Sequence, residues 1–256
     1  MISLKTDKDL LKMRECGRLV ALAIRKMAAH IRPGITTGEL DRIGHDFLAQ
    51  NGAVPSFLNY RGFPKSVCIS VNDEVVHGIP GPRELQEGDI VTLDIGAYKD
   101  GFHGDGAWTF PVGEISPAAR RLLNVTREGL YQGIAQARAG RTTGHIGHAV
   151  QSYVESQGCS VVRDLVGHAI GRRLHEQPDV PNFGRPGRGE TLRPGMTICI
   201  EPMINEGRPE VKTLADDWTV VTQDGKLSAH FEHMVAITDG APEILTALPE
   251  EEAIHA

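Results

Sequence analysis

Acidic residues in this chain lie inside segments whose other residues belong in a protein core. The segments are IVTLDIGAY around Asp94, FHGDGAWTF around Asp105, LVGHAIG around His168, MTICIEPMI around Glu201 and HFEHMVAIT around Glu232. Buried carboxylates need a compensating charge, and these segments contain no lysine or arginine. A divalent cation is the simplest partner, because oxygen-rich ligation with one imidazole suits hard or borderline metals. The segments therefore predict a metal site, and we expect it to hold two ions.

The composition is that of an ordinary soluble globular protein of 256 residues with a net charge of −6. This charge argues against a general DNA-binding or membrane-binding protein. The scattered cysteines, Cys16, Cys68, Cys159 and Cys199, form no CxxC pair and predict reduced thiols. The sequence shows neither a signal peptide nor an apolar run of membrane-spanning length. We therefore expect a cytoplasmic protein without a membrane partner.

Apolar spacing and capping patterns predict both helices and strands. We expect helices over residues 7–30, from Thr36 to Asn51-Gly52, from Ser116-Pro117 to about Ala139, and from Thr143 to Gly158. Strand candidates are 66–71, 89–97, 103–112, 196–204, 217–222 and 230–238. The acidic tail after Ile244 is expected to fray. Because helices and strands come in alternating groups, the fold class is α+β.

Two stretches of the sequence recur in the same order. RPGITTGELDRIGHDFLAQNG from Arg32 resembles RAGRTTGHIGHAVQSYVESQG from Arg138, and LQEGDIVTLDIG resembles LRPGMTICIEPM. The second pair matches Asp94 to Glu201. We expect one catalytic domain over residues 1–256, built from duplicated halves at about 30–112 and 136–240 that each bring a carboxylate to a shared cleft. The alternative is that both stretches are generic loop–helix and turn–strand units.

Strand geometry can bring these carboxylates together. A hairpin turn at Asp100-Gly101 would let Asp94 and Asp105 meet on one face of an antiparallel pair. The same alternation points Glu201 with Cys199, and Glu232 with His230 and Met234. Alone, an aspartate on a strand is more often a solvated residue, and a histidine is more often hydrogen-bonded core. Taken together, the set predicts the bridged carboxylate geometry of a two-metal hydrolase.

The chain also resembles a known family. GDIVTLDIGAYKDGFHGD, GHAIGRRLHEQP, MTICIEPM, FEHMVAIT and PKSVCISVNDEVVHGIP are similar to segments of bacterial type I methionine aminopeptidases, over about residues 3–246. The resemblance implies a pita-bread fold with two pseudo-symmetric halves, antiparallel sheet and covering helices. It also implies removal of the initiator methionine from nascent proteins whose second residue is small.

The resemblance further implies a role for each site residue. Asp94 would bind one metal, Asp105 and Glu232 would bridge two, and His168 and Glu201 would complete the other shell. A water or hydroxide that bridges the metals would attack the scissile amide, with Glu201 shuttling the proton. The two divalent ions could be cobalt, manganese, iron or zinc. The remaining catalytic residues would be His175, which stabilises the oxyanion, and His77, which contacts the amide nitrogen.

The methionine pocket implied by the resemblance combines both of these histidines with an apolar set. That set comprises Phe57, Tyr60, Phe63, Cys68, Leu174 and Trp218. The sequence departs from the family pattern in and around this pocket. Leu174 replaces a frequent phenylalanine, Phe57 and Phe63 replace cysteine and tyrosine, and Gly96 replaces threonine. Arg172-Arg173 also changes a usually small position. These departures affect the expected pocket shape and second-residue tolerance, not the ligands.

The implied partners are the N-termini of nascent polypeptides, and we expect a monomer. Arg172, Arg173, Arg185 and Arg188 are a candidate rim for the ribosome or the nascent chain, although surface arginines are usually only solvated.

Two other interpretations of the function are open. Proline-directed and creatinase-like enzymes share the fold but usually carry a large extra N-terminal domain. Metal-free binding modules of this fold typically lack ligands, whereas this sequence keeps all five.

Overall fold

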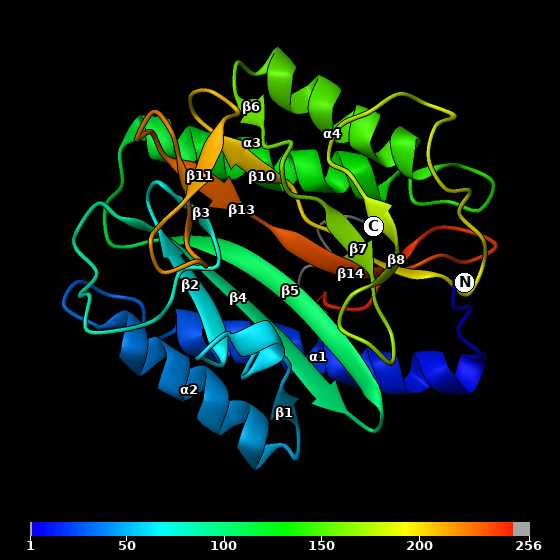
Figure 1. Cartoon of the computed structure of the whole chain (residues 1–256), viewed down its shortest axis with the longest axis horizontal. Helices are drawn as coiled ribbons and strands as arrows, with labels where there is room; N and C mark the ends of the chain where they lie inside the picture. Colours follow the sequence, from blue (N-terminus) through cyan, green and yellow to red (C-terminus); the bar gives the residue numbers. More distant parts are fainter. Residues whose placement is uncertain (1, 248–256) are drawn as a thin grey trace.

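A twisted antiparallel sheet runs through the middle of the protein (Figure 1). The computed structural model describes residues 2–247. Strand order in this sheet is β1-β4-β5-β14-β9-β7-β8, with β2 paired to β4 and β15 paired to β14. The bounds are β1 (Val54–Pro55), β2 (Val67–Val71), β4 (Ile90–Lys99), β5 (Phe102–Pro111), β7 (Gly167–Ala169), β8 (Glu176–Val180), β9 (Thr197–Ile200), β14 (Glu232–Ala236) and β15 (Glu243–Ile244).

Short strands form two smaller sheets beside the large one. One has the order β13-β10-β6, and the other has the order β11-β12-β3. Their bounds are β3 (Glu74–Val76), β6 (Ser160–Val161), β10 (Met203–Asn205), β11 (Val211–Thr213), β12 (Val220–Thr222) and β13 (Ser228–His230). A short 3-10 turn, η1 (Tyr60–Gly62), completes the assignment between β1 and β2. The predicted α+β class, with antiparallel sheet and covering helices, is confirmed.

The helices begin where their caps predict. Thr6 caps α1 (Asp7–Ala28), Thr36 caps α2 (Thr37–Gln50) in a capping box with Glu39, and Ser116 precedes Pro117 of α3 (Pro117–Ile134). The fourth, α4 (Thr143–Ser156), begins at the predicted threonine. The prediction that α3 continues to Ala139 is wrong. The helix ends at Ile134, and the backbone of residues 140–144 bonds instead to residues 188–192.

All of these helices cover the sheet face opposite the predicted ligands. Val91, Leu93 and Ile95 of β4 pack in a buried cluster with residues of α1 and α2. Ile198 and Ile200 of β9 pack in a second cluster with α3 and α4. Figure 1 shows α1 and α2 beside β4 and β5, and α3 and α4 at the other end of the sheet. The alternate residues of the same strands therefore face away from the helices, toward the site.

The two repeated stretches make matching hydrogen bonds. Gly34 N–H donates to Leu85 O, and Gly140 N–H donates to Leu192 O. Thr36 forms an isolated bridge with Glu84, and Thr142 forms one with Thr191. Generic turn–helix units would not share partners at the same offset. We propose from these bonds that the chain is one domain of two related halves, 30–112 and 136–240.

Two predicted strands are each broken where the chain passes between sheets. Residues 196–204 divide into β9 and β10 at Glu201-Pro202, and residues 230–238 divide into β13 and β14 at Phe231. Proline has no N–H to donate, and Phe231 N–H instead donates to Pro202 O. The two breaks lie side by side, because Ile200 pairs with His233 and Met203 pairs with His230.

The predicted fraying after Ile244 is wrong for the next two residues. Leu245 and Thr246 are buried, and Met234 donates hydrogen bonds to the Thr246 hydroxyl and receives one from Leu245 N–H. Gly17 of α1 lies directly against the Leu245 carbonyl, where a Cβ would be 2.2 Å from the oxygen. The rest of the tail, residues 248–256, lies outside the described residues.

Within residues 2–247, no helix combines the length and apolar character needed to cross a membrane.

A buried ion pair fixes the N-terminal segment to β8, next to the site. Lys5 Nζ lies 2.8 Å from Glu176 Oε2, and the two side chains are 2% and 7% exposed. Burial alone would raise the pKa of Glu176, but the hydrogen bond and the charge of Lys5 outweigh it, so this pKa is lowered. Since Glu176 follows His175, the pair anchors the segment that carries this histidine.

We expect Lys5→Met to lower the free energy of unfolding by about 3 kcal/mol at pH 7, because it leaves a buried carboxylate unpaired. The folded-state pKa of Glu176 lies below its unfolded value, so the pair stabilises at neutral pH. That contribution is lost as the pH falls through the folded pKa. Urea unfolding at pH 7 and at pH 4 measures both effects.

Arg14→Met, which removes an exposed pair with Glu243, is the control and should cost under about 1 kcal/mol. An equal, pH-independent loss in both variants would contradict this account.

Candidate metal centre and substrate pocket

The strand register places three of the predicted ligands on one patch of the sheet. Asp94 of β4 pairs with Ala107 of β5, and Ala107 pairs in turn with Glu232 of β14. The small alanine therefore stands between the two carboxylates. Asp105 lies two residues before Ala107 on the same face, opposite Gly96. The predicted Asp100-Gly101 turn is present, with both residues at positive φ, and it sets this register.

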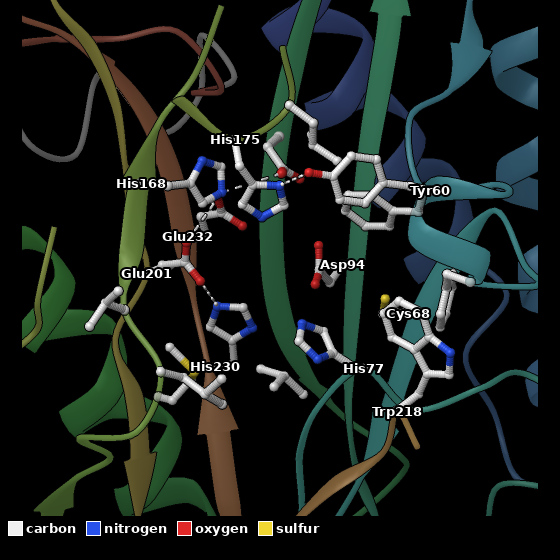
Figure 2. Close-up of a pocket in the computed structure, with 18 of the residues that line it drawn as sticks. Tyr60, Cys68, His77, Asp94, His168, His175, Glu201, Trp218, His230 and Glu232 are labelled. Atoms are coloured by element: carbon white, nitrogen blue, oxygen red, sulfur yellow. Dashed lines mark hydrogen bonds and ion pairs between the residues drawn. The ribbon is translucent and has the colours of Figure 1, made fainter. Parts of the chain in front are cut away.

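The other two predicted ligands come from the neighbouring strands. Glu201 follows β9 directly and comes level with Glu232, because Ile200 pairs with His233. His168 lies on β7, beside β9. Its Nε2 is 3.5 Å from Glu201 Oε1 and 3.8 Å from Asp105 Oδ2. Figure 2 shows His168, Glu201 and Glu232 on one side of the pocket, with Asp94 facing them.

These carboxylates are buried without a basic partner. Asp94, Asp105 and Glu232 are 9%, 3% and 4% exposed, and among the described residues no lysine or arginine forms an ion pair with them. Burial and then mutual repulsion raise the pKa values of Asp94, Glu201 and Glu232 well above the usual range. Burial also raises the pKa of Asp105 to about 7. Protein groups alone therefore do not keep this set ionised.

The donor set fits a divalent metal. One ligand atom each of Asp105, His168, Cys199 and Glu232 lies within 4.8 Å of all the others, and Glu232 Oε1 has no hydrogen-bond partner among the described residues. Burial lowers the pKa of His168 to about 4, so its imidazole is neutral and can donate a lone pair. The chain therefore offers several oxygens and one nitrogen around a single point.

Two polar residues at the centre were not among the predicted site residues. Burial raises the pKa of the Cys199 thiol well above its usual value, so without a cation this thiol stays protonated. His230 Nε2 lies 3.7 Å from Glu201 Oε2, and burial lowers the pKa of this histidine to about 3. Strand alternation already put Cys199 beside Glu201 and His230 beside Glu232. What the sequence did not show was that the two strand breaks meet.

The two predicted catalytic histidines flank this centre. The ring of His175 lies 4.2 Å from that of His168, stacks on Tyr60 and accepts or donates a hydrogen bond of 2.9 Å at the Tyr60 hydroxyl. Burial and neighbouring positive groups lower the pKa of His175 to about 3. His77 lies at φ 61° after β3, and burial lowers its pKa. Both imidazoles are therefore neutral at pH 7 and can donate one N–H each.

An apolar end of the same pocket adjoins His77. Phe63 and Trp218 meet edge to face at 5.1 Å, and the ring of His77 is 6.2 Å from that of Trp218. Phe57, Tyr60, Cys68 and Leu174 complete the wall, so every residue predicted for the metals, catalysis or methionine lines one pocket (Figure 2). The pocket also takes in residues that were not predicted: Arg61, Val76, Leu165, Val166, Met203 and His230.

Comparisons with known proteins agree with this arrangement. Residues 11–239 match the model of metallopeptidase family M24. The chain is 54% identical to methionine aminopeptidase 1 of Bacillus subtilis over 246 residues, which cover 96% of this chain and 99% of the relative. The crystal structure of methionine aminopeptidase from Rickettsia prowazekii superposes with a TM-score of 0.95 at 43% identity, covering 96% of this chain and all of the other.

The chain belongs to the methionine aminopeptidases of metallopeptidase family M24. It shares its fold with more distant proteins as well. A Xaa-Pro dipeptidase from Bacillus anthracis, 24% identical, superposes with a TM-score of 0.79, and the match covers 96% of this chain but 62% of that one. This likeness concerns the fold alone. The predicted resemblance and enzyme class are confirmed, and the prolidase-like reading is not favoured.

Gly96, one of the departures noted in the sequence, has no room for a side chain. A Cβ on it would be 2.7 Å from Ser56 Cβ and 2.9 Å from Phe57 Cε1. Ser56 and the Phe57 ring therefore both occupy the space that a side chain at position 96 would take. Removing the Phe57 ring would free only part of that space.

We expect Gly96→Thr to push the Phe57 ring into the pocket and raise KM for methionyl peptides at least about fivefold, with a smaller change in kcat. Phe57→Cys alone should enlarge the pocket and also raise KM. The double variant should recover part of the loss, because Phe57→Cys removes the ring while Ser56 stays close to position 96. Steady-state kinetics of the four proteins form the cycle. Additive effects of the two changes would show that Gly96 and Phe57 do not compensate.

Proposed function

We propose that this protein removes the initiator methionine from polypeptides whose second residue is small, in a metal-dependent reaction. The observation that carries the proposal is one pocket with two ends. An apolar, aromatic end suits a flexible thioether, because sulfur–ring contacts are favourable. The other end of the same pocket holds the buried carboxylates and His168.

We propose that Asp94, Asp105, His168, Glu201 and Glu232 hold two divalent ions there. Cobalt, manganese, iron or zinc would suit these ligands, and availability often decides which is used. When bound, such ions supply a water whose pKa is lowered toward neutrality. The support from the structure is the set of buried carboxylates, whose raised pKa values only a nearby cation would reverse.

The protein's own groups then orient the peptide and move its protons. Glu201, at the edge of the pocket, is placed to accept a proton and return it to the leaving amine. His175 is neutral, so its Nδ1 would accept from the Tyr60 hydroxyl and its Nε2–H would donate to the scissile carbonyl oxygen. His77 stands between the apolar end and the carboxylates and would contact the amide nitrogen. Phe57, Tyr60, Phe63, Cys68, Leu174 and Trp218 would enclose the methionine side chain.

The setting of this activity follows from the substrate. We propose that a monomer acts in the cytoplasm on the N-termini of nascent chains, with the ribosome as a candidate second partner. Of the four arginines predicted as a contact rim, Arg172 is partly engaged within the protein. Its guanidinium lies 3.3 Å from Asp9 Oδ1 and 4.5 Å from the centre of the Phe102 ring.

The test is a metal-titrated assay of Met-Ala-Ser against Met-Pro and Leu-Ala-Ser peptides. We expect cleavage of the first to require added metal and to exceed that of Leu-Ala-Ser at least about a hundredfold, because the pocket is shaped for one side chain.

Asp105→Asn and Glu232→Gln should lose activity at least about a thousandfold while keeping the unfolding curve, since a lost charge weakens the metal site. Cleavage without metal, no preference for methionine, or full turnover by either variant would contradict the proposal.

A further inference from the structure

A second, more polar groove continues from the catalytic pocket beyond the two histidines. It shares Arg61, Val166, His168 and His175 with that pocket and adds Arg173, from the loop between β7 and β8, and residues of β8 that include Asp179. The apolar end of the catalytic pocket lies on the other side of the carboxylates from this groove. In Figure 2, Cys68 and Trp218 lie across the pocket from His168 and His175.

The position of the groove identifies what enters it. If methionine fills the apolar end and its carbonyl lies at the carboxylates, the following residues must leave the pocket past His168 and His175. An extended peptide advances roughly 3.3–3.6 Å per residue. The side chains of the third and fourth substrate residues therefore reach the groove, and this step rests on the proposed function.

The groove is bordered by more unpaired positive charge than unpaired negative charge. Arg61 and Arg173 are both exposed, and within the described part of the chain neither guanidinium has an ion-pair partner. Arg61 is held over the Tyr60 ring at 5.3 Å, so it stands at the junction of the two cavities. The carboxylate of Glu176 is already neutralised by Lys5 at 2.8 Å. Asp179 is the one remaining carboxylate that lines the groove, and it accepts a hydrogen bond from Gln177.

We propose that Arg61 and Arg173 form a subsite that selects substrates with an acidic side chain at the third or fourth position. Two guanidiniums free of carboxylates favour a carboxylate over an ammonium on the passing peptide. Both arginines are exposed, so the selectivity is moderate and is screened by salt. It acts on how tightly the peptide is held and not on the step that breaks the bond.

The experiment compares the peptide amides Met-Ala-Glu-Ser, Met-Ala-Gln-Ser and Met-Ala-Lys-Ser, and then the same set with the variable residue one position later. We expect the glutamate peptide to exceed the lysine peptide in kcat/KM by about fivefold or more at low ionic strength, mainly through KM. The ratio should fall toward one at high ionic strength. In Arg61→Gln/Arg173→Gln the ratio should fall to about one, and in Asp179→Asn it should rise.

A matched control removes the same charge elsewhere. Arg120→Gln/Arg127→Gln alters two exposed arginines of α3, on the helical face of the protein, and should leave the ratio unchanged. Equal cleavage of the three peptides by the wild-type protein overturns the subsite, and so does a ratio that survives in Arg61→Gln/Arg173→Gln. Failure of the proposed function would look different, because no methionyl peptide would be cleaved, including the neutral Met-Ala-Gln-Ser.

Discussion

The uncompensated burial of carboxylates on one face of an antiparallel sheet is the constraint on which the rest of the structure depends. Asp94, Asp105 and Glu232 are almost fully enclosed, and Glu201 lies against His168 and His230. Their mutual repulsion and desolvation oppose folding unless a cation is near. Strands β4, β5, β14 and β9 bring the four side chains together in spite of this cost. The helices pack on the opposite face, which leaves the charged face to a pocket instead of a core.

Two local features of the backbone make this arrangement possible. The Asp100-Gly101 hairpin fixes the register that puts Asp94 and Asp105 on one patch, with Ala107 leaving room between Asp94 and Glu232. The breaks at Glu201-Pro202 and Phe231 then let two neighbouring strands leave the large sheet together. Glu201 stands at the first break and Glu232 directly follows the second, so both proposed ligands lie where the chain passes between sheets. Matching hydrogen bonds in the two repeated stretches suggest that one architecture was used twice.

Much of this could be read from the sequence, because local chemistry determined it. Capping residues located the helix starts, and Asp-Gly located the hairpin. The failures were of another kind. The end of α3 depends on bonds between residues 140–144 and 188–192, and the burial of Leu245 and Thr246 depends on contacts with Met234 and Gly17. Neither could be read from a local pattern. For the same reason His230 was placed on the correct strand face but not beside Glu201, and the contact of Gly96 with Ser56 and Phe57 was not foreseen.

The central claim is that a divalent cation compensates these carboxylates, and proton release on metal binding tests it most directly. In the metal-free protein the raised pKa values, about 7 for Asp105, hold protons that a metal must displace, whereas His168 with a pKa of about 4 holds none at neutral pH. Calorimetric titration with Mn²⁺ or Co²⁺ in buffers of different ionisation enthalpy should therefore show proton release that grows as the pH falls from about 8 to about 6, with affinity rising with pH. Binding without proton release at any of these pH values, or no binding at all, would contradict the account.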